Sequence, residues 1–411
     1  MTVQFRKYES PADRPFAHRI WREIGWMEKD QEPGVDALVE AGSAMVAELA
    51  GEPECLVSRA PGEIRYLERD LPFVCLTSVT TSRIARKQGL AARLAAKSLA
   101  EAAAEGALVA GLSMFEQGFY NQLGFGTGGY EHRLALDPSQ LVLSARHRVP
   151  RRLTLQDLPE VHSLRLRRLR GHGSCNLLPM GTTQSDMLLY QNVAGLGFHD
   201  GPHGALSHCL WFSAKELEHG PYEVIALIYQ TWAQMLELLA LIRSFGDQIR
   251  LVRLREPAGL QLQDLLERPF CCRAVSEHSS FAAGIRADAY WQMRICDLPG
   301  CLALTRLSVP ELRFNLLLAD PIGRYLDHDA PWNGISGSYH LVLGPQSSAQ
   351  PGVDETLPTL KASVGAFTRM WLGVLPATGL SVTDELTGSS DLLKALDGAL
   401  RLPRPSPDWD F

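Results

Sequence analysis

Near the N-terminus, the hydrophobic pattern predicts a strand, a helix and a second strand. Residues 73–81, FVCLTSVTT, are short, apolar and β-rich, which predicts a buried strand. Residues 89–106, GLAARLAAKSLAEAAAEG, are dominated by Ala and Leu and end at a glycine, which predicts a helix. The apolar run 107–115 predicts the next strand, and a short helix follows at 120–123. This order predicts a βαβ unit with two parallel strands.

A second strand–helix–strand order lies in the middle of the chain. Residues 223–230, EVIALIYQ, predict a strand, and 231–246 predict a helix with Thr231 as its N-cap and Gly246 at its end. The segment QIRLVRLREP then predicts another strand, closed by Pro257. The order echoes residues 73–114 without their glycine motif, so we interpret it as a degenerate structural repeat.

The remaining third of the chain adds strands at 314–320 and 337–345 and helices at 361–373 and 389–400, the last with Ser389 or Ser390 as N-cap. The final ten residues, LPRPSPDWDF, hold three prolines and are predicted to run extended. We expect three domains, 1–143, 144–290 and 291–411, and an α/β (α+β) fold class.

The composition narrows the possible classes of protein. The 411 residues are 45% hydrophobic and 21% charged, which excludes global disorder. A net charge of −6 excludes a generic nucleic-acid binder, because no basic excess is present to neutralise phosphates. The most apolar stretch, 224–242, is interrupted by polar residues, so no membrane span is expected. The N-terminus lacks the apolar region of a secretory signal, and we expect a cytoplasmic protein without nucleic-acid or membrane partners.

Metal and hydrolase chemistry find little support in the residues. The eight cysteines are scattered and form no C-x-x-C pair, which is typical of reduced, packed thiols. His199, His203 and His208 lie in one Gly/Pro-rich loop, but no Cys or helical H-x-x-x-H register completes a zinc site. We therefore predict no metal, and without a G-x-S-x-G elbow hydrolase chemistry is unsupported.

The segment SVTTSRIARKQGLAARL, residues 78–94, is the most informative for chemistry. A predicted strand runs into a turn at 86–91, and a helix begins at once. Such a turn directs free backbone N–H groups and the positive end of the helix at one point, which suits a pyrophosphate. Gly89 allows a close bend, while Arg86 and Lys87 add positive charge. The R-x-x-G-x-A pattern alone also occurs in ordinary strand-to-helix turns.

These residues resemble the (Q/R)-x-x-G-x-(G/A) motif of the GCN5-related N-acetyltransferase (GNAT) superfamily, matched by Arg86, Gly89 and Ala91. Downstream, SMFEQGFYNQLGFGTG resembles the F-Y-x-x-x-G-[FY]-G stretch of the enhanced-intracellular-survival (Eis)-like acetyltransferases. Segments 291–303, 314–321 and 362–373 are similar to the C-terminal domain of that family. The resemblance covers essentially the whole chain. It implies tandem GNAT-type mixed sheets with flanking helices, the second one degenerate, and a C-terminal sterol-carrier-protein (SCP2)-like domain.

The resemblance also implies the roles of an acetyl-coenzyme A site. The pantetheine arm would lie as an added strand against backbone groups of Val79, Thr80 and Thr81. The pyrophosphate would be held by residues of the turn, namely Arg86, Lys87, Gly89, Leu90 and Ala91. Tyr120 would be the general acid for the departing thiolate, because a phenol of pKa about 10 is protonated at neutral pH. From the residues alone, Phe119 and Tyr120 could also serve only to wedge a short helix onto the sheet.

The C-terminal carboxylate of Phe411 is implied to act on the acceptor amine. With a pKa of about 3.3–3.7 it is a poor base for an ammonium near 10, so it would orient the amine or relay through water unless burial raises its pKa. Most C-termini are frayed, but the proline-rich tail and Trp409 indicate anchoring here. We expect acetyl transfer to fall when residues are added after Phe411 or when Asp410 and Phe411 are deleted.

The segment 21–40, WREIGWMEKDQEPGVDALVE, suggests a cationic acceptor. From Glu23 onward its acids outnumber the single Lys29, and Asp410 adds negative charge at the opposite wall. Such a site attracts a polyamine-like or aminoglycoside-like cation, with Glu28 on its surface. A solvated amphipathic face is an equal alternative.

Aromatic residues complete the expected acceptor side. Trp21 or Trp26 would offer a cation–π contact. Before Glu116, bulky Met114 and Phe115 stand where the Eis-like pattern usually has a small or polar residue, so we expect a reshaped acceptor pocket.

Together, these patterns and the resemblance predict an acyltransferase that moves an acetyl group from acetyl-coenzyme A to a primary amine. The acceptor would be a small cationic molecule or a lysine side chain, attacked directly without an acyl-enzyme. The resemblance implies a homohexamer. The alternative is a non-catalytic protein that binds a lipid or small ligand in the SCP2-like domain, with the GNAT regions as scaffold.

Overall fold

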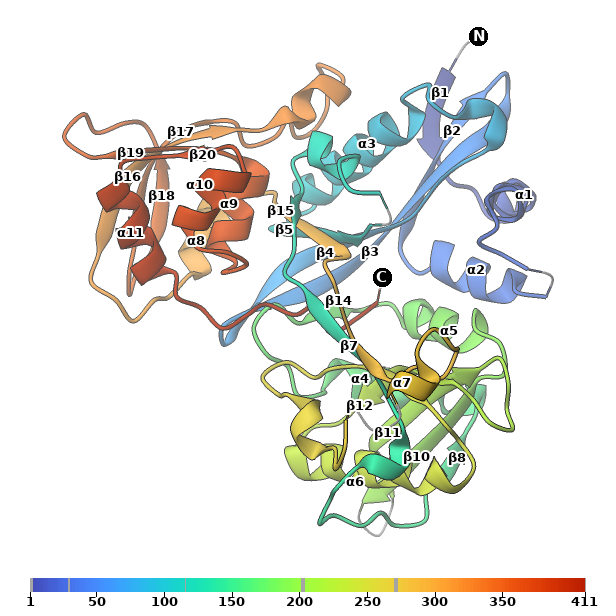
Figure 1. Ribbon diagram of the computed structural model, residues 1–411. Helices are drawn as coiled ribbons and strands as arrows, with labels where there is room; N and C mark the ends of the chain where they lie inside the picture. Colours follow the sequence, from blue (N-terminus) through green and yellow to red (C-terminus); the bar gives the residue numbers. More distant parts are fainter. Residues whose placement is uncertain (1–2, 29, 115, 201–203, 270–272, 411) are drawn as a thin grey trace.

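Three β-sheets organise the computed structural model, which describes residues 3–28, 30–114, 116–200, 204–269 and 273–410 (Figure 1). Within these residues the first sheet has eight strands in the order β1-β2-β3-β4-β5-β15-β6, with β9 paired to β3. They are β1 (Val3–Lys7), β2 (Ser43–Leu49), β3 (Glu52–Tyr66), β4 (Arg69–Thr81), β5 (Val109–Ser113), β6 (Gly126–Thr127), β9 (Cys175–Leu177) and β15 (Trp291–Ile295). The fold is mixed α/β, as predicted.

The second sheet repeats the strand order of the first. Its strands are β7 (Glu131–Leu136), β8 (Arg151–Leu153), β10 (Ala194–Asp200), β11 (Ala205–Ala214), β12 (Tyr222–Ile228), β13 (Val252–Arg255) and β14 (Gly284–Asp288). From β8 to β14 every pair is antiparallel except β12–β13. From β1 to β6 the single parallel pair, β4–β5, stands at the same place. The strand order therefore confirms the predicted repeat.

Both of these sheets take strands from beyond a predicted domain boundary. β9, which follows residue 143, pairs with β3 in the first sheet. β15, which follows residue 290, pairs with β5 and β6 in the first sheet. β7, which precedes residue 143, pairs with β13 and β14 in the second. The boundaries at 143 and 290 stay predictions, and the exchanged strands tie the two sheets together.

Helices cover the sheets at matching positions of the repeat. They are α1 (Arg14–Ile24), α2 (Glu32–Val39) and α3 (Leu90–Ala104), and then α4 (Leu158–Leu166), α5 (Met180–Leu188), α6 (Trp232–Ser244) and the single turn α7 (Arg273–Ser276). The predicted helices 89–106 and 231–246 are confirmed as α3 and α6, the latter with Thr231 at its N-cap. Across the described ranges, no helix has the length and apolar character needed to cross a bilayer.

The C-terminal part forms a five-stranded sheet covered by helices. Its strands are β16 (Leu312–Ala319), β17 (Gly337–Leu343), β18 (Ser348–Pro351), β19 (Thr359–Ser363) and β20 (Leu386–Thr387), and its helices are α8 (Leu298–Leu304), α9 (Val364–Trp371), α10 (Ala377–Thr383) and α11 (Ser390–Ala399). The predicted helix 361–373 is too long at its start, because β19 runs to Ser363, whose side chain caps α9 at the Ala366 N–H. Ser389 caps α11, as predicted.

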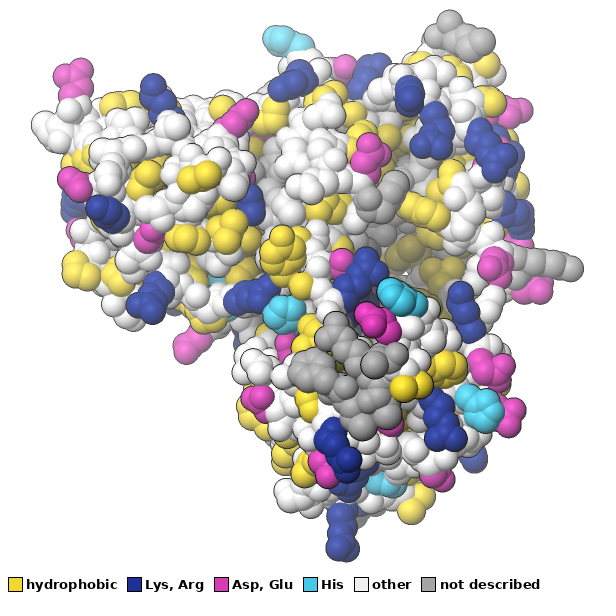
Figure 2. Space-filling model, viewed as in Figure 1, with side chains coloured by type: hydrophobic (Ala, Val, Ile, Leu, Met, Phe, Trp, Pro, Cys, Tyr) yellow, Lys and Arg dark blue, Asp and Glu magenta, His cyan; other side chains and the backbone are white. Residues whose placement is uncertain are grey.

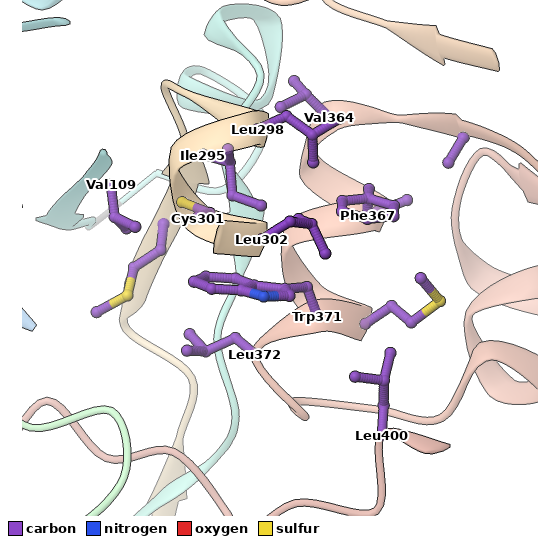
Figure 3. Close-up of a cluster of buried hydrophobic side chains, with 14 of the residues drawn as sticks. Val109, Ile295, Leu298, Cys301, Leu302, Val364, Phe367, Trp371, Leu372 and Leu400 are labelled. Carbon is purple, nitrogen blue, oxygen red and sulfur yellow. The ribbon is translucent and has the colours of Figure 1, made fainter. Parts of the chain in front are cut away.

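One hydrophobic core joins this C-terminal part to the first sheet (Figure 3). Trp371 of α9 belongs to the same buried cluster as Leu302 of α8 and Phe367 of α9. Ile295 of β15 and Val109 of β5 belong to the same cluster and are fully buried. Because the cluster is continuous, the two parts share a core and are not merely in contact at their surfaces.

Candidate active site

The parallel strands β4 and β5 separate and leave an opening in the first sheet. They pair only over residues 73–75 and 109–111. Beyond this point β4 keeps β3 on one side, with a register shift and a positive φ at Ser78, but has no strand partner toward β5 in the described residues. This free edge includes Val79, Thr80 and Thr81, the residues predicted to hold the acyl donor.

The turn after β4 presents unpaired backbone N–H groups. The one-turn helix η1 (Arg83–Ala85) follows β4, and α3 begins at Leu90 with Gly89 as its N-cap. Lys87 and Gly89 adopt positive φ values of 60° and 75°. No side chain caps α3, and within the described chain no hydrogen bond engages the N–H groups of residues 86–89. Unpaired N–H groups at a helix start are the arrangement that binds a pyrophosphate.

The side chains of the turn divide into exposed charges and buried anchors. Arg86 and Lys87 are exposed and form no ion pair with any described residue, so both can meet an anion. Leu90 is buried in the core beneath the turn, and Ala91 is half-buried beside it. A Cβ on Gly89 would meet nothing within 4 Å, so the glycine is needed for its positive φ and not for space.

Tyr120 lies in the core near the end of β4. It begins the short helix η2 (Tyr120–Leu123), is 5% exposed, and packs edge-on against Phe119 and Phe125. No described residue hydrogen-bonds to its hydroxyl. Burial, and then the nearby Cys55 and Glu116, raises the pKa of Tyr120 well above 10, so the phenol stays protonated at neutral pH.

The acids of segment 23–40 are largely paired with bases, which corrects the predicted excess of negative charge. The pairs are Glu23 with Arg19 and the Arg83 N–H, Glu32 with Arg22, Asp36 with Arg14 and His18, and Glu40 with Arg14. Glu28 accepts a hydrogen bond from Gln191 at 2.8 Å. A count that starts at Glu23 omits Arg14, Arg19 and Arg22, which lie earlier in α1 and supply most of the compensating charge.

The predicted aromatic contacts differ in accessibility. Trp26 is 42% exposed, whereas Trp21 is 4% exposed and packs edge-to-face against it with ring centroids 5.7 Å apart. Trp21 is therefore a core residue, and Trp26 is the one of the pair that can meet a ligand. Glu116 is exposed. Phe115 and Phe411, both predicted site residues, lie outside the described residues.

Asp410 lies where strands of both large sheets meet. Its carboxylate accepts hydrogen bonds from the Tyr290 hydroxyl at 3.0 Å and from Arg255, and Arg133 is 3.3 Å away. Burial acts to raise the pKa of Asp410, but the two guanidinium groups outweigh it and lower the pKa below its usual value. Because the Met114 N–H donates to the Tyr290 carbonyl at 2.7 Å, this cluster borders the end of β5.

A groove of about 500 Å³ lies at this end of β5. Its lining residues are Met114, Gln117, Arg133, Arg286, Asp288, Ala289 and Tyr290. Arg286 and Asp288 pair at 2.7 Å, so the groove carries both signs of charge and is not the purely acidic wall expected. In Figure 2 the surface is hollowed between the first and second sheets, with hydrophobic side chains inside and both kinds of charge around the rim.

Sequence reasoning missed the residues that hold the tail. Arg168 donates to the Asp408 carboxylate at 2.8 Å and to its carbonyl at 3.0 Å, although the two residues are 240 positions apart. The Arg165 guanidinium lies 3.6 Å from the ring centroid of Trp409, which is 1% exposed. The anchoring of Trp409 was predicted, but a local pattern carries no signal for partners so distant in the chain.

No metal centre is found among the described side chains of His, Cys, Asp and Glu. His199 and His208 lie 3.8 Å and 3.2 Å from Glu160 and Glu237 respectively. His203, the third member of the sequence cluster, is outside the described residues.

The match of one segment to a known family gives the class of enzyme. Residues 15–128 match the family described as acetyltransferase (GNAT) domain, and this segment contains the β4–β5 opening, the turn and Tyr120. The chain is accordingly an acyltransferase whose acyl donor is acetyl-coenzyme A. No curated protein sequence matches this chain.

Solved structures share this fold over the whole chain. A conserved protein of unknown function from Enterococcus faecalis V583, a probable N-acyltransferase, has a TM-score of 0.77 at 17% identity and 98% coverage of both chains. A GCN5-related N-acetyltransferase from Anabaena variabilis ATCC 29413 gives 0.77 at 15% identity, with 100% of this chain and 99% of that chain covered. Eis1 from Mycobacterium abscessus gives 0.74 at 15% identity and 100% coverage of both. At these identities the likeness shows the fold.

Proposed function

We propose that this chain is an Eis-like N-acetyltransferase that moves the acetyl group of acetyl-coenzyme A directly onto a primary amine. The proposal is carried by one convergence: a free strand edge, a turn of unpaired N–H groups and a buried phenol meet at the opening of the first sheet. The likeness in fold to N-acetyltransferases along the whole chain supports it.

The donor would be held mainly by backbone groups. The edge at Val79, Thr80 and Thr81 offers the pattern of an added strand to the pantetheine amides. The N–H groups of 86–89, which have no partner in the described chain, and the side chains of Arg86 and Lys87 would bind the pyrophosphate. Because these groups are already in place, the thioester is positioned without rearrangement of the turn.

Tyr120 would act on the departing sulfur. Its raised pKa keeps the proton on the phenol, while a thiol has an ordinary pKa near 8.5. Complete proton transfer to the thiolate is therefore uphill, and the phenol acts first as a hydrogen-bond donor to the charge that develops on sulfur. Thr81, at the end of β4, donates to Cys55 at 3.3 Å, and Cys55 and Tyr120 belong to the same buried cluster.

The acceptor would be a primary amine, either of a polyamine-like or aminoglycoside-like cation or of a lysine side chain. Because the acids of segment 23–40 are mostly paired, charge alone favours a polycation less than the sequence suggested. Trp26, Glu28, Glu116 and Asp410 stay candidates for the acceptor side. A role for the Phe411 carboxylate as base or amine-orienting group stays a prediction.

The same resemblance supplies further predictions: an SCP2-like C-terminal domain, a homohexamer and a cytoplasmic location. The alternative of a lipid-binding protein gains no support from the C-terminal core. There Phe314, Phe367 and Trp371 fill the described interior at 0–1% exposure, which disfavours a wide apolar tunnel.

Release of free thiol from acetyl-coenzyme A tests the proposal, with polyamines, aminoglycosides, arylamines and lysine peptides as acceptors. Tyr120→Phe should lower turnover about 10²–10⁴-fold. It should leave melting temperature and donor affinity nearly unchanged, because no described residue bonds to the lost hydroxyl. Tyr325→Phe, which removes a hydroxyl bound to Gln122 of η2 at 2.7 Å, is the matched control and should keep full turnover. Acetylation of no amine class would contradict the proposal, and full activity of Tyr120→Phe would reduce Tyr120 to a packing residue.

A further inference from the structure

The second sheet repeats the opening of the first. β12 and β13 run parallel but pair only over residues 222–223 and 252–253. Residues 224–228 of β12 therefore have no strand partner toward β13 in the described chain, just as the end of β4 has none toward β5. By strand order alone, a second acyl-donor site would be expected here.

The helix that follows this second opening begins with a capping box, which the helix after the first opening lacks. The Thr231 hydroxyl accepts a hydrogen bond from the Gln234 N–H at 3.3 Å. The Gln234 side-chain carbonyl in turn accepts from the N–H groups of Thr231 and Gln230 at 3.2 and 2.8 Å. This capping box gives the N–H groups of Gln230, Thr231 and Gln234 partners from the protein itself. α3 begins at Gly89 without any side-chain cap, so its N–H groups stay available.

The second opening is filled by the tail of the chain. A cavity of only about 60 Å³ remains there, bounded by residues 224–229, by Arg255 at the end of β13 and by residues 408–410. Figure 1 shows the tail leaving α11 and running between the first and second sheets. The Cys175 N–H donates to the Pro407 carbonyl at 2.7 Å and the Ser406 N–H to the His172 carbonyl at 3.1 Å, which fixes the approach of the tail.

Three arginines hold the tail in this opening: Arg165 in α4, Arg168 just after α4, and Arg255 at the end of β13. Arg168, with its side chain 4% exposed, binds Asp408 and is itself fixed by the Asn176 side chain at 2.6 Å. Arg165 stacks on Trp409 and pairs with Asp186 at 2.5 Å. The third, at the end of β13, pairs with Asp410.

We infer that the second opening has become the holder of the chain's own tail: three arginines fix residues 408–410 there, place Asp410 beside the end of β5, and leave no room for a second acyl donor. Arg165, Arg168 and Arg255 are then positioning residues for transfer at the first opening. The positioning part rests on the proposed function, whereas the occupancy of the second opening does not.

Two variants of the full-length chain test the same contact from its two sides. Arg168→Gln removes the guanidinium from the opening, and Asp408→Asn, at a half-exposed tail position, keeps the side-chain size while removing the charge. Arg401→Gln, at an exposed position of the tail before the opening, is the matched control. Three measurements are made on the natural chain and on each variant. Hydrogen exchange is followed in peptides covering residues 402–410. Calorimetry gives the number of acetyl-coenzyme A molecules bound per chain, and kinetics give kcat and KM.

We expect one acetyl-coenzyme A per chain in every form. In Arg168→Gln the tail should exchange at least tenfold faster and kcat should fall at least tenfold, with KM for acetyl-coenzyme A changed less than twofold. In Asp408→Asn the tail should exchange about threefold faster and kcat should fall about threefold. Arg401→Gln should match the natural chain in both. A merely structural role would instead lower the melting temperature and the donor affinity together.

Three results would overturn the inference: two donors bound per chain, unchanged tail exchange in both variants, or faster tail exchange with unchanged kcat. If the natural chain acetylates no amine, the proposed function fails by itself. Exchange and stoichiometry then still decide whether the second opening holds the tail.

Discussion

At the scale of single residues, the turn at the first opening differs from α1 and from the tail in how its basic side chains are paired. The arginines of α1 are paired with acids of the segment that follows it, and the arginines around the tail are paired with its carboxylates. Arg86 and Lys87 have no such partner in the described chain. A side chain left unpaired beside unpaired N–H groups is available for an anionic ligand, and this contrast supports the proposed donor site at the turn.

Reversing the charge at the turn should weaken donor binding. Arg86→Glu loses a charge-assisted hydrogen bond and sets a carboxylate beside the pyrophosphate, so we expect a loss of about 1.5–3 kcal/mol in acetyl-coenzyme A affinity. Calorimetry measures this directly. Arg69→Glu, an exposed position at the far end of β4, is the control and should leave affinity unchanged. An unchanged affinity in folded Arg86→Glu would remove the turn from the site.

The ion pairs of Asp410 should make tail docking sensitive to acid. Burial opposes ionisation, but Arg255 and Arg133 lower the pKa of Asp410 in the folded chain. The unfolded chain then binds the proton more readily, so the contribution is present above the ordinary Asp pKa of about 3.9 and is lost as pH falls through the lowered pKa. Asp410→Asn should therefore melt below the natural chain at pH 6–8, and the two curves should converge in acid. A melting difference that does not vary with pH would show that these ion pairs do not stabilise the fold.

Local patterns predicted the turn and η2, but not the surroundings of the tail. Gly89 and the residues around it are contiguous in sequence, so their geometry follows from strand and helix signals. Arg168 and Asp408 are 240 residues apart, and only the folded chain brings them together. The charge of segment 23–40 was misjudged because its basic partners are arginines of α1 that precede Glu23 in the chain.

At the scale of elements, the two openings differ in how the following helix begins. Gly89 leaves the start of α3 uncapped, whereas Thr231 closes α6 with a capping box. The helix periods and the Thr231 cap were readable from the sequence. The β19–α9 junction was not, because residues 359–363 are too few to separate from the apolar pattern of the helix that follows.

Substitutions at the two helix starts should differ in their effect on acetyl-coenzyme A affinity. Thr231→Ala should lower the free energy of unfolding by about 0.5–2 kcal/mol through loss of the cap and leave acetyl-coenzyme A affinity unchanged. Gly89→Ala forces a Cβ into a left-handed conformation at a cost of about 1–2 kcal/mol, and it should weaken the donor as the turn shifts. Denaturant unfolding and calorimetry on both variants check this. Equal losses of donor affinity in the two would mean that α6 also serves a donor.

At the scale of the whole molecule, exchanged strands, a shared core and the tail join the three sheets. β15 and β7 cross between the two large sheets, and the cluster around Trp371 runs from the first sheet into the C-terminal part. The repeat and the mixed α/β class could be predicted from periodicity. The strand exchange could not, because β15 is only five residues long and pairs with β5 about 180 residues away.

The shared core should carry the effect of donor binding into the C-terminal part. Acetyl-coenzyme A at 100 times its dissociation constant stabilises the unit that binds it by about 2.7 kcal/mol. Because the cluster containing Val109, Ile295 and Trp371 is continuous, the first sheet and α9 should unfold together. The slowest amides of α9 should then exchange about 100-fold more slowly with saturating donor, although α9 contributes no residue to the donor site.

Exchange measured by mass spectrometry tests this, with Arg86→Glu under the same donor concentration as the control that should lose the protection. If donor slows exchange in α3 but leaves α9 unaffected, the two parts open independently, and the shared core packs them together without making them one cooperative unit.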